Sequence, residues 1–90
     1  MRVMKLVVVF RLNSEHGRKT EEFIHEFSRR YPETKIEPLN IDGREGYATA
    51  MLYDIVRYPG ILVTRDDGTM SMMWQGEDLP MIDEVAGYLH

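Results

Sequence analysis

The feature that most constrains this chain is the run Leu6-Val7-Val8-Val9-Phe10 near its start. The run is short, entirely apolar and rich in β-branched residues, which favours a strand over a helix. Because the side chains of a strand alternate between its two faces, an unbroken apolar run indicates burial on both faces. We therefore expect this strand to lie inside a sheet that other elements cover on both sides.

The segment after this strand has the pattern of an amphipathic helix. Ser14, which follows Asn13, is predicted to cap the helix, and Pro32 is predicted to end it. The apolar residues of this segment fall on one helical face. They are Phe23, Ile24, Phe27 and Tyr31.

Residues 35–42 predict a second strand, and Pro38 places it at an edge of the sheet because proline donates no ladder hydrogen bond. Asp42 and Glu45 have the spacing of a capping box, which predicts that Asp42 caps a second helix. That helix is expected to end near Val56 and to face the core through one apolar stripe. The stripe comprises Tyr47, Ala48, Met51, Leu52 and Ile55.

The last third of the chain predicts a hairpin followed by a helix. Residues 60–64 and 69–75 are the two strands, and Asp66-Asp67-Gly68 is the turn between them. Met70, Met72 and Trp74 share one face of the second strand and are assigned to the core, whereas Met73 is left unassigned. Asp78 is predicted to cap the closing helix, with Pro80 in its first turn. The apolar stripe of this helix is Ile82, Val85, Ala86 and Leu89.

The element order is therefore β-α-β-α-β-β-α. A helical crossover makes the first two strands parallel, and the hairpin makes the last two antiparallel. This predicts an α/β fold, a three-layer sandwich with a four-stranded mixed sheet. Ninety residues suffice for one core, so residues 1–90 are predicted to form a single domain.

Several segments resemble the thioredoxin-like fold superfamily, and together they span nearly the whole chain. Val7–Phe10 resembles the strand before the family's active site. Residues 53–59 are similar to the family's helix end, loop and cis-proline. The other similar segments are Asn40-Ile41-Asp42, Asp67-Gly68 and Gly76. The resemblance implies the minimal thioredoxin-like fold.

The family's redox motif, two cysteines separated by two residues, is missing here because the chain has no cysteine. Counting from Phe10 places the motif on residues 15–18, whereas counting back from the helical stripe places it on residues 14–17. Both positions remain open. Thiol–disulfide exchange needs a thiolate, so this chain is not a thiol–disulfide oxidoreductase. The same absence excludes disulfides and cysteine-based zinc sites.

The resemblance also implies a binding surface around Pro59, which matches the family's cis-proline. In that family this loop presents backbone groups to an extended peptide. Arg57 and Tyr58 flank the loop, and a tyrosine offers an apolar ring and a hydroxyl to a partner.

A second group of candidate residues lies where the first helix begins: Ser14, Glu15, His16, Gly17 and Arg18. One interpretation is a serine nucleophile with a histidine base, although neighbouring positions on one turn rarely provide that geometry. A second is anion binding by the helix N-terminus with Arg18, which Glu15 opposes. A third, which we favour, is an N-cap followed by a polar first turn.

Charge and composition exclude several other classes. The net charge is −4 without a basic cluster, which argues against a nucleic-acid partner. The apolar run at residues 6–10 is too short for a membrane span or a signal peptide, so a cytoplasmic location is predicted. His16, His25 and His90 lack ligand-like spacing, so no metal or other cofactor is expected.

The sequence thus predicts a non-catalytic thioredoxin-like binding or accessory module that recognises a protein segment near His16, Tyr58 and Pro59. One alternative is a small anionic ligand or a non-thiol enzyme that uses Ser14, His16 and Arg18. A second alternative is a structural homodimer formed through the edge strand or the methionine-rich face.

Overall fold

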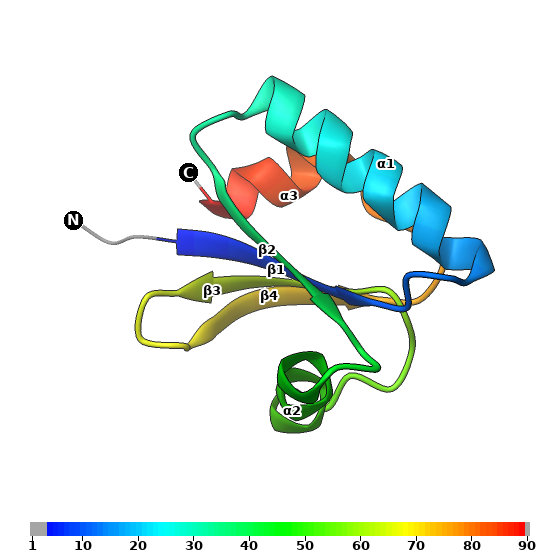
Figure 1. Ribbon diagram of the computed structural model, residues 1–90. Coiled ribbons are helices and arrows are strands. Elements are labelled where there is room, and N and C mark those ends of the chain that lie inside the picture. Colours follow the sequence, from blue (N-terminus) through cyan, green and yellow to red (C-terminus); the bar gives the residue numbers. More distant parts are fainter. Residues whose placement is uncertain (1–3, 90) are drawn as a thin grey trace.

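The computed structural model describes residues 4–89, and within them the elements follow the predicted order (Figure 1). The elements are β1 (Met4–Phe10), α1 (Glu15–Arg30), β2 (Lys35–Asn40), α2 (Arg44–Leu52), β3 (Gly60–Arg65), β4 (Met70–Gln75) and α3 (Ile82–Leu89). The strands form one mixed sheet in the order β2-β1-β3-β4. β1 is parallel to β2 and antiparallel to β3, so the apolar run lies inside the sheet as predicted.

Three layers are visible in Figure 1, with α1 and α3 on one face of the sheet and α2 on the other. The alternating side chains of β1 supply both cores: Leu6 and Val8 point to the α1 and α3 side, and Val7 and Val9 to the α2 side. Each face of the central strand is therefore buried, as its composition requires.

Pro38 occupies β2, an edge strand, as expected. Just beyond β2, the Ile41 N–H donates to the Phe10 carbonyl oxygen of β1 at 2.9 Å. Backbone groups of a strand alternate in direction, so the N–H groups of Glu37 and Leu39 also face β1 and the Pro38 nitrogen faces outward. The proline therefore removes no ladder bond and leaves the outer edge short of one donor for strand pairing.

The predicted orientation of α2 is wrong. Tyr47, Met51 and Leu52 are 59%, 66% and 75% exposed, and Ala48 is exposed as well. The residues that α2 buries are Gly46 and Ala50. A Cβ at Gly46 would lie 2.0 Å from the Asn40 carbonyl oxygen, so α2 contacts the end of the preceding strand at a position where no side chain fits. That close backbone approach decides which face of the helix turns inward.

The boundaries of α2 also differ from the prediction. The helix ends at Leu52 rather than near Val56, and Asp54 then has a positive φ of 61°. Its N-cap is Gly43, without a side-chain hydrogen bond. Asp42 does not cap the helix, because its carboxylate accepts a hydrogen bond from Arg11 Nε at 3.3 Å.

Two further predictions fail near the end of the chain. α3 begins at Ile82, so Asp78 and Pro80 precede the helix instead of forming its cap and first turn. Met70 is 42% exposed, since it lies beside the turn at the end of edge strand β4, beyond a shift in register at Val63/Thr64. Trp74 does pack against the α1 and α3 core, and Met73 packs on the α2 side.

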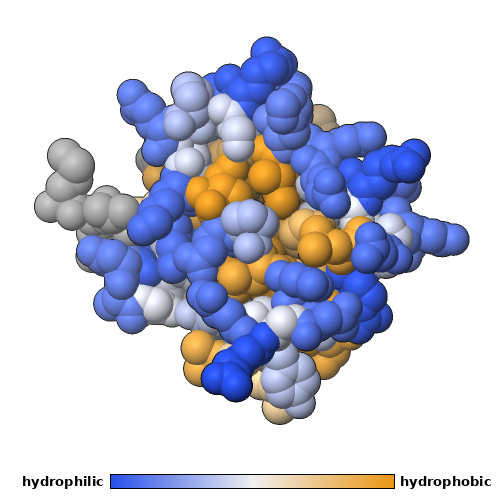
Figure 2. Space-filling model, in the orientation of Figure 1, coloured by the Kyte–Doolittle hydropathy of each residue, from blue (hydrophilic) through white to orange (hydrophobic). Residues whose placement is uncertain are grey.

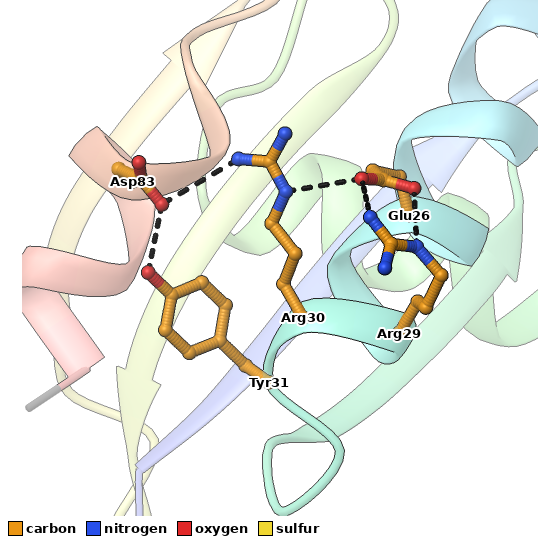
Figure 3. Close-up of polar contacts among 5 residues, drawn as sticks. All are labelled: Glu26, Arg29, Arg30, Tyr31 and Asp83. Carbon is orange, nitrogen blue, oxygen red and sulfur yellow. Dashed lines mark hydrogen bonds and ion pairs between the residues drawn. The ribbon is translucent and has the colours of Figure 1, made fainter.

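A polar cluster connects the end of α1 to α3 (Figure 3). Glu26 accepts hydrogen bonds from Arg29 and from Arg30 Nε, the latter at 3.0 Å. These bonds hold the pKa of the Glu26 carboxyl at about 2, well below its ordinary value. The Tyr31 hydroxyl donates to Asp83 at 2.7 Å, which raises the pKa of Tyr31.

Candidate functional site

The turn that leads into α1 is closed by a small hydrogen-bond network. The Ser14 hydroxyl donates to the Arg11 carbonyl oxygen at 2.7 Å, and the Arg11 N–H donates to His16 Nε2 at 3.1 Å. His16 Nδ1 lies 3.2 Å from Ser14 Oγ. Ser14 is the N-cap by position, yet its side chain makes no capping bond because it is held by this network.

The network fixes the tautomer of His16. The single proton of the Ser14 hydroxyl is directed to the Arg11 carbonyl, so Oγ can only accept from the Nδ1–H of His16. Nε2 is then the unprotonated nitrogen that accepts the Arg11 N–H. His16 therefore holds the turn in place through both of its ring nitrogens.

Gly17 is buried in the first turn of α1, and the reason is close packing of the chain on itself. A Cβ at this position would lie 2.4 Å from the Leu12 carbonyl oxygen and 2.7 Å from that of Arg11. Backbone atoms already fill the space beside Gly17, so this glycine shapes the turn and does not admit a ligand.

The second wall of the site is the loop that joins α2 to β3. Its Tyr58–Pro59 peptide bond is cis, and Pro59 is fully buried. The Pro59 carbonyl oxygen accepts a hydrogen bond from the Gly76 N–H at 3.1 Å. The Tyr58 ring packs against the core on the α2 side.

Gln75, at the end of β4, holds this loop from the opposite direction. Its Oε1 atom accepts from the N–H groups of Val56 at 2.9 Å and Arg57 at 3.1 Å. Sequence reasoning missed this role. The only available signal was the hairpin register, which pairs Gln75 with Gly60 and so brings it beside the loop.

Two adjoining hollows meet at His16 and Glu77, and we call them together the His16 groove. The first, of about 160 Å³, is lined by Glu15, His16, Lys19, Thr20, Pro59, Glu77 and Leu79. The second, of about 480 Å³, is lined by His16, Val56, Arg57, Tyr58, Gly76 and Glu77. The groove therefore runs between the start of α1, the loop before β3 and the segment after β4.

The structure brings together most of the residues singled out in the sequence. Those that line the groove are Glu15, His16, Arg57, Tyr58 and Pro59. Ser14 and Arg18 line neither hollow, and Arg18 is exposed to solvent. Sequence reasoning missed Lys19, Val56, Glu77 and Leu79 as wall residues, because they come from segments distant from one another in the chain.

The groove carries both signs of charge. Glu15 and Glu77 face it together with Lys19 and Arg57. The negative charges of these two carboxylates offset the positive end of the α1 dipole. The first hollow is therefore a poor site for a lone anion. A groove that offers both charges and exposed apolar atoms can contact charged as well as apolar side chains of a partner.

Within residues 4–89, no three His, Asp or Glu side chains gather closely enough to hold a metal ion, and His90 lies outside these residues. In the same range, none of the helices combines the length and apolar character needed to cross a bilayer.

Known structures share this architecture over almost the whole chain. A thioredoxin from Fasciola hepatica is 18% identical, with a TM-score of 0.74, and the match covers 96% of this chain and 82% of that one. A thioredoxin from Schistosoma mansoni is 19% identical, with a TM-score of 0.73 and coverage of 96% and 75%. Thioredoxin-2, a component of the malaria parasite's protein secretion machinery, is 10% identical, with a TM-score of 0.77 and coverage of 96% and 80%.

No family model matches the sequence, and no curated protein matches it. The structural similarity is at low identity and establishes the fold. The chain thus has a thioredoxin-like fold without cysteine, and it lacks the redox pair.

Proposed function

We propose that this protein is a non-redox binding module that holds an extended segment of another protein in the His16 groove. The observation that carries the proposal is the groove itself, whose walls are fixed by hydrogen bonds before any partner arrives. Ser14 and His16 hold one wall, and Gln75 holds the other. A site that is already ordered loses little conformational entropy when it binds.

The residues at the groove suit a protein segment. Val56 is 73% exposed, and the half-buried Tyr58 adds an aromatic ring beside it. The Arg57 guanidinium lies beside Gly76, and its atoms are about 4 Å from the position that a Cβ at Gly76 would occupy. Tyrosine and arginine are enriched at protein interfaces, where a few such residues supply most of the binding energy.

The anionic-ligand alternative has less support. Arg18, the cation it needs, lies outside the groove, whereas Glu15 and Glu77 line the hollow at the start of α1. The nucleophile alternative needs an acceptor nitrogen of His16 at Ser14 Oγ, and the hydrogen-bond pattern puts a proton there instead.

A peptide-display selection against the purified protein tests the proposal. We expect selected peptides to shift the amide resonances of His16, Arg57 and Glu77 in NMR titrations. Val56→Glu should weaken binding about tenfold or more, because it places a charge in the apolar part of the groove. Met81→Glu is the matched control, since Met81 is 74% exposed and does not line the groove.

Two results would contradict this function. One is a selection that yields no binder above the background of an unrelated protein. The other is a set of binders whose affinity is the same for the Val56→Glu and Met81→Glu variants.

A further inference from the structure

The outer side of α2 is an apolar surface that no part of the described chain covers. Tyr47 and Met51 are four residues apart on the helix, as are Ala48 and Leu52, so these four side chains are neighbours. All four are exposed, the three large ones by 59% to 75%. We call these four residues the α2 face. Hydrophobic residues show at the surface in Figure 2 where α2 lies, at the bottom of the view.

The two ends of the α2 face carry charges that oppose their own helix. Arg44 is the first residue of α2, at the positive end of the helix dipole, and Asp54 follows the negative end. Both side chains are exposed, and within residues 4–89 neither forms a hydrogen bond or an ion pair. Each charge would be better placed beside the opposite end of a helix.

We propose that the α2 face binds a second copy of this chain, with the two α2 helices packed antiparallel about a two-fold axis. Such a dimer places Arg44 of each copy beside Asp54 and the negative helix end of the other. The apolar side chains between these charges are then buried against their own counterparts. The inference concerns a surface outside the His16 groove and does not depend on the proposed function.

The chemistry of the face favours a second copy over an unrelated protein. A two-fold interface uses the same surface on both partners, so the surface must complement itself. Arg44 at one end of the apolar centre and Asp54 at the other meet opposite charges across a two-fold axis only in the antiparallel arrangement. Ala48, a small residue within the face, allows two helices to approach closely. Glu45 is also exposed in the first turn, and its negative charge is already well placed beside the positive end of its own helix dipole.

The size of the face sets the expected strength. A nine-residue helix is only about 14 Å long and about 10 Å wide, so one side of it offers far less area than the roughly 800 Å² per partner of a standard stable interface. We therefore expect a reversible dimer with a dissociation constant on the order of 10–100 µM. Self-association at this strength appears as a concentration-dependent rise in sedimentation coefficient.

The first experiment is sedimentation velocity of the purified chain from about 5 to 500 µM, a range that brackets this dissociation constant. We expect the wild type to shift from monomer toward dimer. Met51→Glu should stay monomeric at every concentration, because it buries a charge at the centre of the interface. Met81→Glu changes a methionine of comparable exposure that directly precedes α3, a helix on the other face of the sheet from α2, and this variant should dimerise like the wild type.

The second experiment tests the antiparallel geometry by exchanging charges. Arg44→Glu alone and Asp54→Lys alone should each weaken dimerisation, because like charges then meet at both ends. An equimolar mixture of the two variants should form a heterodimer, since both end contacts again join opposite charges. Asp54→Asn, which suits the positive φ at this position, removes the charge without reversing it and should weaken the dimer less.

A monomer at the highest concentration, or equal association of the Met51→Glu and Met81→Glu variants, would overturn the proposal. Failure of the charge-exchanged mixture to associate more strongly than either variant alone would also overturn it. Thermal melting of each variant shows whether it is folded. These outcomes are independent of peptide binding, because monomeric Met51→Glu retains an intact His16 groove.

Discussion

The two faces of the sheet are covered in opposite ways. On one face, α1 and α3 bury large apolar side chains, and Phe27 and Val85 have no solvent exposure. On the other face, α2 buries Gly46 and Ala50 and turns Tyr47 and Met51 toward solvent. Both arrangements come from helices with apolar residues at regular helical spacing.

The difference shows that an apolar stripe does not by itself orient a helix. In α1 the residues that pack closely, Gly17 and Thr20, are buried together with Phe23 and Phe27, so close packing and burial of the apolar stripe are compatible in this helix. In α2, the backbone at Gly46 lies so close to Asn40 that only a residue without a side chain fits. Close backbone packing fixes the rotation of α2, and the stripe residues within the helix are left outside, whereas Ile55, beyond the end of the helix, is buried as predicted.

Truncation of one large side chain on each side of the sheet should show the largest difference between the two faces. Phe27→Ala removes a fully buried ring and should lower the free energy of unfolding by about 3–5 kcal/mol. Tyr47→Ala removes a ring of similar size that is mostly exposed and should change it by less than about 0.5 kcal/mol. Urea denaturation measures both values, and comparable losses would mean that α2 buries its stripe after all.

The glycines of α2 and α3 provide the next test. Gly46→Ala forces a Cβ against backbone atoms of Asn40 and should destabilise the protein by about 2–3 kcal/mol. Gly87→Ala is the matched control, because a Cβ there meets nothing within 4 Å. It should stabilise α3 by about 0.5–1 kcal/mol, since alanine favours helix more than glycine does. Changes of the same sign at both positions would contradict the close approach at Gly46.

A smaller effect is expected where β4 holds the loop that leaves α2. Gln75→Leu removes the acceptor for the Val56 and Arg57 N–H groups and should cost about 1 kcal/mol. Amide hydrogen exchange at these two residues should become faster. Gln75→Glu retains an acceptor oxygen and should keep exchange slow. Equal exchange in all three proteins would show that Gln75 does not hold the loop.

The smallest effect concerns the exposed end of α1. The hydrogen bonds from Arg29 and Arg30 lower the pKa of Glu26 to about 2 from 4.5, so the folded state binds this proton less readily than the unfolded state. The resulting stability is present above pH 4.5 and is lost as the pH falls toward 2. Thermal melts should therefore show a steeper acid loss for the wild type than for Glu26→Gln. Glu22→Gln, on an exposed part of the same helix, should behave like the wild type.

Local patterns in the sequence were sufficient to predict the fold. The apolar run of β1 required burial on two faces, Pro38 marked an edge, and Gly68 with its positive φ marked the hairpin. The stripes of α1 and α3 also predicted Phe23, Phe27, Val85 and Ala86 as buried, although not Gly17 and Thr20, which α1 buries as well. For the groove, the similarity of residues 53–59 to a known loop identified one wall, and the start of α1 identified the other.

How the groove residues come together and how α2 is rotated depend on tertiary packing. Lys19 and Glu77 line the groove from segments far apart in the chain, and Gln75 holds the loop that forms one of its walls. Ser14 lines neither hollow, because its hydroxyl donates to the Arg11 carbonyl oxygen. The rotation of α2 depends on how near its backbone lies to Asn40, a distance set by the packed sheet. Sequence periodicity reports which residues share a side of a helix. Which side turns inward is fixed by steric contact with neighbouring elements, and that contact exists only after the chain has packed.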